Sequence, residues 1–241
     1  FNWWALPNEA SAALISKPPT NLGLVGYWSM NEGTGTRAGD YSGNRNEGVL
    51  TNGPTWVDGK RGKALNFDGV DDFVNVGNPT SLTLGTSDMA VSTWIKAPSG
   101  NGWRDLVSKY TITTDQDFVF QLQDSNADPP TVGARVQSGL WANFGGTNTI
   151  GDNKRLDDNV WHHVVVTRSN STTHSLYVDG ILRQSGTMTN VNITGSTIWS
   201  IGALNSTSQF FNGLIDEVRI YNRALSAAEV RALYNTGAVK Y

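Results

Sequence analysis

The chain has 241 residues, no cysteine and a formal net charge of −3. This length suits one large all-β domain or two small ones. The weak negative charge argues against nucleic acid or an anionic membrane surface as a partner, since both attract clustered lysine and arginine. Nine tryptophans, 26 glycines and a charged fraction of only 16% are typical of a turn-rich β protein. No apolar run approaches the length of a membrane-spanning helix.

Residues 1–20 differ from the rest of the chain. They begin with apolar and aromatic side chains, continue with small residues and end at Pro18 and Pro19. One interpretation is the remnant of a secretory signal, because Ala10, Ser11 and Ala12 form a small-residue pattern like that of a cleavage site. The other is an apolar arm retained in the mature protein, which we favour. The arm's anchoring side chains would be Phe1, Trp3, Trp4 and Leu6.

Between Gly23 and Tyr221 short strand-like segments follow one another, each bounded by Gly, Asn, Asp, Pro or Ser. In the segment 118–123, Phe118, Phe120 and Leu122 alternate with more polar positions, which indicates a sheet with one buried and one wetter face. No strand–helix–strand rhythm appears, and a two-sheet antiparallel sandwich is therefore favoured. The predicted strands cover residues 24–30, 64–67, 72–76, 90–97, 105–110, 118–123, 132–137, 162–168, 174–180 and 197–204.

The segment Gly213–Tyr234 predicts a last strand followed by a small helix. Apolar residues alternate along the strand, and Asp216 interrupts them with a carboxylate that is costly to bury unless it is paired or bound to metal. Ser226 can cap the helix, with Glu229 three residues later as the other half of a capping box. Gly237 is expected to close the helix.

Six motifs in a fixed order carry a family resemblance: GLVGYWSMNEGTGT, DYSGNRNEGVL, GKRGKALNFDGVDDFVNV, WHHVVVTR, LYVDGILRQSG and DEVRIYNRALS. In these motifs the chain resembles the LamG-like jelly-roll domains of the concanavalin A-like lectin/glucanase superfamily. The resemblance implies an all-β, two-sheet antiparallel jelly-roll sandwich over residues 21–241, with one short C-terminal helix, preceded by the arm 1–20. It leaves function open, because this sandwich hosts lectins, adhesins, lyases and glycosidases.

The resemblance also implies a structural Ca²⁺ ion. Carried over by position, the expected ligands are Asp216, Asp40 and Asn46, whose oxygens are of the kind that Ca²⁺ prefers. The chain departs from the family at Asn31, where Asp is common. The alternative is that Asp40 and Asp216 cap turns or pair with Arg219 or Arg223.

Two other clusters invite a metal interpretation. Asp68, Asp71 and Asp72 lie close in sequence, but Asp-Gly is a strong turn signal, and we favour a hairpin turn over a ligand set. His162 and His163 are adjacent on a predicted strand and therefore face opposite ways, so they cannot converge on one ion. His174 could meet one of them, but packing within the sandwich is the favoured interpretation.

Catalytic patterns are hard to find. Glucan-cleaving relatives use carboxylates at alternating positions of one strand, and none of the five glutamates stands in such an arrangement. Asp216 and Glu217 are adjacent and diverge, while Asp115 and Asp117 fall in a stretch typical of a polar turn. The chain is therefore predicted not to be an enzyme.

Two non-enzymatic functions remain. Sugar sites often present aromatic rings, and Trp103, Trp141 and Phe144 lie in glycine-rich settings where rings could contact a glycan or simply be buried. Trp28, Trp94 and Trp161 fall inside predicted strands and are expected to be core residues.

Alternatively, the segment Phe1–Ile15 could dock on a neighbouring subunit and propagate a polymer, or fold back on its own sandwich. We predict a non-enzymatic, secreted cell-surface protein that self-assembles through its arm into an extracellular filament, with an adhesive role as a further expectation. Three sequons, at Asn170, Asn192 and Asn205, are compatible with export. The alternative prediction is a calcium-stabilised, carbohydrate-binding, lectin-like module.

Overall fold

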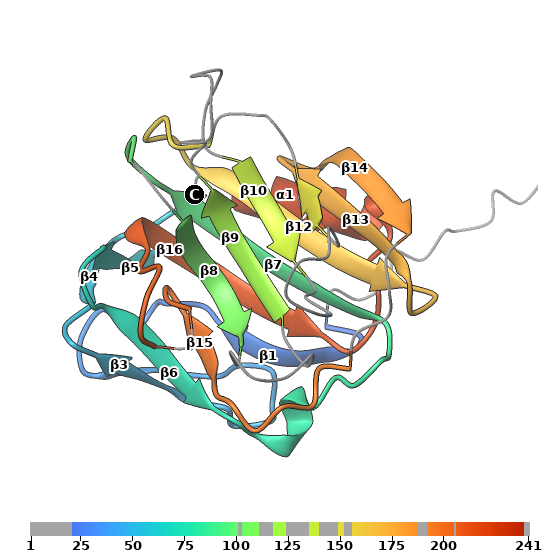
Figure 1. Cartoon of the computed structure of the whole chain (residues 1–241). Coiled ribbons are helices and arrows are strands. Elements are labelled where there is room, and N and C mark those ends of the chain that lie inside the picture. Colours follow the sequence, from blue (N-terminus) through green and yellow to red (C-terminus); the bar gives the residue numbers. More distant parts are fainter. Residues whose placement is uncertain are drawn as a thin grey trace, which may run out of the picture.

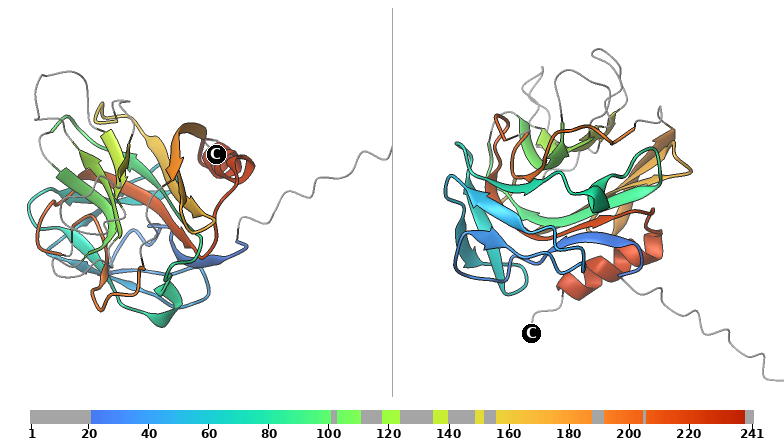
Figure 2. Two further views of the ribbon diagram at one scale, coloured as in Figure 1. Left: turned by 45° about the vertical axis from the view of Figure 1, so that its right-hand side comes forward. Right: turned by 90° about the horizontal axis from the view of Figure 1, so that it is seen from below.

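The computed structural model describes residues 21–100, 103–110, 118–123, 135–139, 149–151, 156–187, 192–204 and 206–238. In this part of the chain two eight-stranded antiparallel sheets stack face to face, and one α-helix lies outside the stack (Figures 1 and 2). The predicted two-sheet sandwich with a C-terminal helix is confirmed. Among the described residues, no helix has the length and hydropathy needed to cross a membrane.

The sheet that we call sheet A is continuous from one edge strand to the other. Its order is β14 (Ile181–Thr187), β13 (Thr173–Val178), β12 (His162–Ser169), β7 (Met89–Lys96), β16 (Asn212–Tyr221), β5 (Lys63–Asp68) and β4 (Thr55–Asp58). β16 is long enough to have two partners on one side: its first half pairs with β5 and its second half with β1 (Leu24–Trp28).

Sheet B forms the opposite layer. Its order is β11 (Thr149–Gly151), β10 (Arg135–Gly139), β9 (Phe118–Gln123), β8 (Trp103–Lys109), β15 (Trp199–Ile201), β6 (Phe73–Gly77), β3 (Gly48–Thr51) and β2 (Arg37–Ala38). A short 3₁₀ turn, Thr80–Leu82, follows β6.

The main core fills the space between the sheets. Phe118, Phe120 and Leu122 of β9 belong to it, as the alternation in the sequence predicts. Trp28 and Trp199 are also buried there, and each indole N–H donates to a backbone carbonyl, that of Asn46 and that of Leu82 respectively. These bonds satisfy the only polar atom that each ring carries into the core.

Helix α1 (Ala227–Ala238) covers the outer face of sheet A, away from β8 and β9 (Figure 2, right). The predicted capping box is present: the Ser226 N–H donates to Glu229 at 2.8 Å, and the Glu229 N–H donates to Ser226 Oγ at 3.3 Å. The helix ends at Ala238, one residue past Gly237, so the predicted end was slightly early.

Three expectations about individual segments need correction. The turn at Asp68–Asp72 is not a hairpin, because β5 belongs to sheet A and β6 to sheet B, and the turn therefore carries the chain from one layer to the other. Trp94 is buried, but outside the main core, where its ring stacks on Tyr234 of helix α1 at 5.6 Å. Trp161 lies just before β12 and is only half-buried.

Candidate functional site

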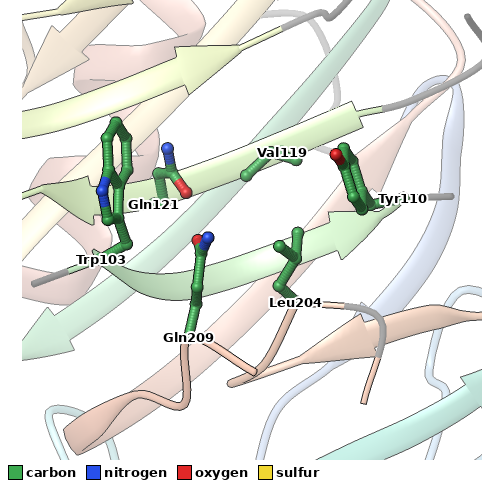
Figure 3. A pocket seen from close by; sticks show the side chains of 6 residues that line it. All are labelled: Trp103, Tyr110, Val119, Gln121, Leu204 and Gln209. Carbon is green, nitrogen blue, oxygen red and sulfur yellow. The ribbon is translucent and has the colours of Figure 1, made fainter. Parts of the chain in front are cut away.

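A groove crosses the outer side of β8, on the face of sheet B that points away from the core (Figure 3). Trp103 and Tyr110 lie at the two ends of the strand, and the other walls come from β9 and from the loop after β15. The groove encloses about 90 Å³. Its described lining residues are Trp103, Tyr110, Val119, Gln121, Leu204 and Gln209.

The two ends of the groove differ in chemistry. At one end the indole of Trp103 lies beside the side-chain amides of Gln121 and Gln209 (Figure 3). At the other end Tyr110 lies near the apolar side chains of Val119 and Leu204. A molecule held here would meet a ring and hydrogen-bonding groups at one end and mainly apolar surface at the other.

The alternation of β9 explains how the sequence builds this wall. Phe118, Phe120 and Leu122 point into the core, and successive side chains of a strand point to opposite faces. Val119 and Gln121 must therefore point outward, and both line the groove. The face of this strand that was predicted to be wetter carries the groove, but Val119 and Gln121 are both buried, so the expectation of a wetter face is wrong for these residues.

The loop after β15 is attached to β8 by backbone hydrogen bonds at two points. The Gly202 N–H donates to the Leu106 carbonyl at 3.0 Å, and the Asp105 N–H donates to the Gln209 carbonyl at 2.8 Å. Gln209 itself has a positive φ of 52°, an uncommon backbone conformation for a residue other than glycine. The position of the Gln209 side chain on the groove is thus fixed by the backbone.

Asp105 does not line the groove, but it neighbours the polar end in the sheet. It pairs directly with Gln121 across β8 and β9, and directly opposed side chains lie on the same face of a sheet. The Asp105 carboxylate is fully buried, and neither of its oxygens has a hydrogen-bond partner in the described part of the chain. Burial raises the pKa of Asp105 well above its ordinary value. The Oε1 atom of Gln209 likewise has no partner among the described residues.

Of the aromatic residues predicted to contact sugar, Trp103 lies in the groove and is 37% exposed. Trp141 and Phe144 lie outside the described residues, as do the arm residues Phe1, Trp3, Trp4 and Leu6. Contact between Trp103 and a glycan stays a prediction.

Both carboxylate oxygens of the predicted calcium ligand Asp40 are occupied by hydrogen bonds. Its Oδ1 accepts hydrogen bonds from the backbone N–H groups of Tyr27 (2.9 Å) and Ser42 (2.8 Å). Its Oδ2 accepts from the N–H of Asn46 (2.8 Å) and from Ser42 Oγ (2.9 Å). Asp40 therefore organises the loop before β3 as a turn cap, which is the alternative that the sequence left open.

The side-chain amide of Asn46 is likewise occupied by hydrogen bonds. Its side-chain amide donates to the Val25 carbonyl and accepts from Ser81 Oγ, both at 2.8 Å. The structure thus brings Asp40 and Asn46 together, but through hydrogen bonds that use their ligand atoms. This pair does not fit a metal ion.

Asp216 differs from these two residues. It is fully buried, its Oδ2 accepts a hydrogen bond from the Arg61 N–H at 2.9 Å, and its Oδ1 has no partner among the described residues. Burial raises the pKa of Asp216 to about 8, against the opposing effect of the Arg61 N–H. A buried oxygen without a partner is what a cation could satisfy, so Asp216 fits a metal site. Asn31 reaches the same loop, where its Oδ1 accepts from the Lys63 N–H at 2.8 Å.

Glu217, the neighbour of Asp216, points elsewhere. A bulge interrupts the register of β16 between Asp216 and Arg219, and Glu217 has a positive φ of 57°. Its carboxylate pairs with Arg219 at 2.5 Å and accepts from the Tyr27 hydroxyl at 3.1 Å. Arg219 is therefore not a partner of Asp216. Arg223 pairs with Glu229, so the alternative ion pairs considered for Asp40 and Asp216 are wrong.

The cluster of Asp68, Asp71 and Asp72 forms hydrogen bonds within its own turn. Ligand atoms of Asp68, Asp71 and Asp72 lie within 4.8 Å of one another. Within this set Asp72 accepts from the Asp68 N–H at 3.0 Å, and Asp68 accepts from the Val70 N–H at 2.8 Å. These bonds are those of a turn, which was the favoured interpretation.

The three histidines do not converge. The ring of His162 lies 2.9 Å from Asp179 and 3.2 Å from Asp158, whereas that of His163 lies 2.9 Å from Ser92. Burial lowers the pKa of His163 to about 3. His174 pairs with Arg168, at the far end of β12 from the other two.

Several groove residues were missed from the sequence. Gln121 and Val119 could have been found, because the alternation already placed them on the face of their strand opposite the core. Leu204 and Gln209, like the neighbouring Asp105, carry no comparable signal, since their position depends on the pairing of β8 with β9 and β15 and on the path of a loop.

A family model described as the concanavalin A-like lectin/glucanases superfamily matches residues 68–231, well over half of the chain. The curated Paraclostridial mosquitocidal protein 1 of Paraclostridium bifermentans is 24% identical over 249 residues, covering 98% of this chain and 19% of that protein. The chain thus spans about a fifth of the length of this relative.

Two solved structures illustrate the shared fold. The crystal structure of the binding domain of Paraclostridial mosquitocidal protein 1 has a TM-score of 0.68 and 21% identity, covering 90% of this chain and 53% of the other. Domain 4 of AbnA, a GH43 extracellular arabinanase from Geobacillus stearothermophilus solved with arabinotriose, also has a TM-score of 0.68 and 21% identity, covering 88% and 98%. At these identities the similarity establishes the fold alone.

Proposed function

This chain belongs to the concanavalin A-like lectin/glucanase superfamily, and from that premise we propose that it is a non-enzymatic, carbohydrate-binding domain that holds a glycan in the groove on β8. The observation that carries the proposal is the polar end of the groove, where the ring of Trp103 lies beside the amides of Gln121 and Gln209 (Figure 3). A sugar presents C–H groups on its faces and hydroxyls at its edges. Aromatic rings match the former, and amides match the latter.

The similarity to other proteins supports the same function. Domain 4 of AbnA has this fold and was solved with an oligosaccharide, and the structural neighbour from Paraclostridial mosquitocidal protein 1 is a binding domain. We propose binding rather than catalysis because the groove lacks the carboxylate pair of a glycosidase among its described lining residues.

The test of this function is direct binding to glycans. The full chain is screened on a glycan array, and the best ligands are measured by calorimetry. Trp103→Ala should weaken binding about tenfold or more, as expected for a buried aromatic contact. The control Tyr41→Ala removes an exposed ring outside the groove, 60% exposed against 37% for Trp103, and should leave the affinity unchanged. Binding that survives Trp103→Ala would refute this site.

Calcium is proposed as a structural ion rather than as part of the groove. Asp216 would hold it, with Asn31 and the loop at residues 59–63 as neighbours. When bound, Ca²⁺ would neutralise a buried carboxylate and link β16 to that loop.

We also propose an extracellular location, which the extracellular arabinanase among the structural neighbours supports. Self-assembly through residues 1–15 stays a prediction from the sequence, since those residues lie outside the described part of the chain. Electron microscopy of the full chain beside a version that starts at Thr20 tests it. Filaments that vanish on truncation would support assembly through the arm, and single particles in both samples would exclude it.

A further inference from the structure

Strand β14 forms an edge of sheet A, and its outer side pairs with no other described strand (Figure 1). It has seven residues, all of them exposed except Gly186, which is half-buried. The outer strands β4, β11 and β2 have only four, three and two residues. An exposed edge presents a row of backbone N–H and C=O groups to an incoming strand. By length and exposure, β14 is therefore well suited to accept one.

Strand β1, which pairs on one side only, differs from β14 because a loop covers its other side. The loop at residues 40–46 lies along it: the Tyr41 N–H donates to the Tyr27 carbonyl at 2.7 Å. The side-chain amide of Asn46 donates to the Val25 carbonyl at 2.8 Å. The exposure of β14 shows that the described chain gives it no comparable cover.

Apolar side chains flank the edge of β14 on both faces of the sheet. Ile181 and Leu182 are 57% and 50% exposed, and successive residues of a strand point to opposite faces. Leu182 pairs with Tyr177 of the cluster under helix α1, so it lies on the helix side. Ile181 pairs with Val178 of the main core and lies on the other side. A strand added beside β14 would meet an apolar side chain on each face.

An open groove lies at the start of this edge. It encloses about 530 Å³ between Gly180, the residue before β14, and one flank of helix α1. The helix residues that line it are Ala227, Ala228, Arg231, Ala232 and Asn235. Because most of these side chains are short, the groove has room for a large apolar side chain of an incoming strand.

The apolar segment that precedes the described residues matches these two features. Residues 1–20 include the large apolar side chains Trp3, Trp4 and Leu6. The described chain begins at Asn21, just before β1, and β1 lies five strand spacings from β14, about 24 Å. Crossing this distance within one copy would use at least about seven residues of the arm. The edge of a second copy is open to the whole arm.

We propose that β14 is the acceptor for the arm of a second copy, with part of Phe1–Ile15 pairing along the strand and its large apolar side chains entering the groove beside helix α1. Backbone hydrogen bonds would supply affinity, and the side chains at the edge would supply specificity. Each copy would give its arm at one surface and receive another at a different surface, so the contact is heterologous and can repeat. The proposal names a surface for the predicted self-assembly and is independent of glycan binding.

Complementation between two variants tests the proposal by analytical ultracentrifugation. Leu182→Lys places a charge on the acceptor edge and keeps the arm, whereas the version that starts at Thr20 keeps the edge and lacks the arm. The parent chain should self-associate, and each variant alone should do so at least about tenfold more weakly. An equimolar mixture of the two should form a one-to-one complex that grows no further. Val49→Lys, at a 42% exposed position of β3 in sheet B, should associate like the parent.

Amide hydrogen exchange gives a second measurement on the unsubstituted edge. Residues 181–187 should exchange at least about tenfold more slowly in the associated parent chain than in the version that starts at Thr20. Equal exchange would exclude β14 as the acceptor, and a mixture that forms no complex would exclude docking between copies. Melting temperatures near that of the parent confirm that both lysine variants are folded.

Failure of this proposal can be told apart from failure of the proposed function. A parent chain that stays monomeric, or a folded Leu182→Lys chain that associates like the parent, would overturn the role of β14. Glycan binding is measured separately through Trp103→Ala, and neither result would alter it.

Discussion

The backbone N–H of Arg61 donates a hydrogen bond to Oδ2 of Asp216 at 2.9 Å, although 155 residues separate the two in sequence. The loop between β4 and β5 therefore lies directly over the bulge of β16. The approach is close enough that a Cβ atom on Gly59 would lie 2.4 Å from the Lys63 carbonyl oxygen and 2.8 Å from Asp216 Oδ2. The glycine at this position is what allows the loop to reach the buried carboxylate.

Gly59→Ala should consequently destabilise the chain by about 2 kcal/mol or more, because backbone atoms must move to admit the new methyl group. Urea denaturation measures the change in the free energy of unfolding. Gly186→Ala is the matched control, since nothing lies within 4 Å of a Cβ atom at that position. Equal stability of the two variants would contradict the close approach.

Calcium is expected to raise the melting temperature through Asp216. An ion that binds only the folded state adds about 2.7 kcal/mol at one hundred times its dissociation constant, which corresponds to a shift of several degrees for a domain of this size. Differential scanning fluorimetry with Ca²⁺ and with EDTA measures the shift, and Asp216→Asn should abolish it. Identical melting temperatures of the parent chain in Ca²⁺ and in EDTA would eliminate the calcium site.

In EDTA the stability of the chain should depend on pH through the same residue. The folded pKa of Asp216 is about 8, against an ordinary value of 3.8. Between these values the folded state retains a proton that the unfolded state has lost, so the free energy of unfolding falls as the pH rises from about 4 to about 8. At about 1.4 kcal/mol for each pH unit between the two values, the loss should not exceed about 6 kcal/mol. Across this pH range the free energy of unfolding should change less for Asp216→Asn than for the parent chain. Equal changes in the two proteins would show that Asp216 is not the source of the pH dependence.

Asp40 should stabilise the fold without any metal. Asp40→Ala removes the acceptor of three backbone N–H groups and one hydroxyl, and we expect a loss of about 2 kcal/mol in both Ca²⁺ and EDTA. Asp71→Ala, at an exposed position, should cost less than about 0.5 kcal/mol. A loss for Asp40→Ala that appears only in Ca²⁺ would instead indicate that Asp40 is a metal ligand.

A separate prediction concerns the capping box formed by Ser226 and Glu229. Burial alone would raise the pKa of Glu229. Hydrogen bonds from Arg223 and Ser226 outweigh this effect and lower the pKa to about 2. Because this folded value lies below the ordinary value of 4.5, the stabilisation is present above pH 4.5 and is lost as the pH falls towards 2. Ser226→Ala should cost about 1 kcal/mol at pH 7. In a double-mutant cycle with Glu229→Ala, purely additive losses would show that the two side chains are not coupled.

Much of the architecture could be predicted from local patterns. The alternation of Phe118, Phe120 and Leu122 identified the core-facing side of β9, and Ser226 with Glu229 located the start of helix α1. These predictions succeeded because each depends on residues a few positions apart. The Asp68–Asp72 turn was misassigned as a hairpin, because a turn signal does not reveal whether the next strand joins the same sheet or the other one.

The sequence by itself determined the sandwich, the family and the division of β9 into a core-facing side and an opposite side that carries Gln121. Only the tertiary structure decided which residues share a site. It separated Asp216 from the hydrogen-bonded pair Asp40 and Asn46, and it brought Asp105 and Gln209 together across β8 and a distant loop. The physical reason is that side-chain direction follows the local period of a strand, whereas the neighbours of a side chain follow from long-range strand pairing.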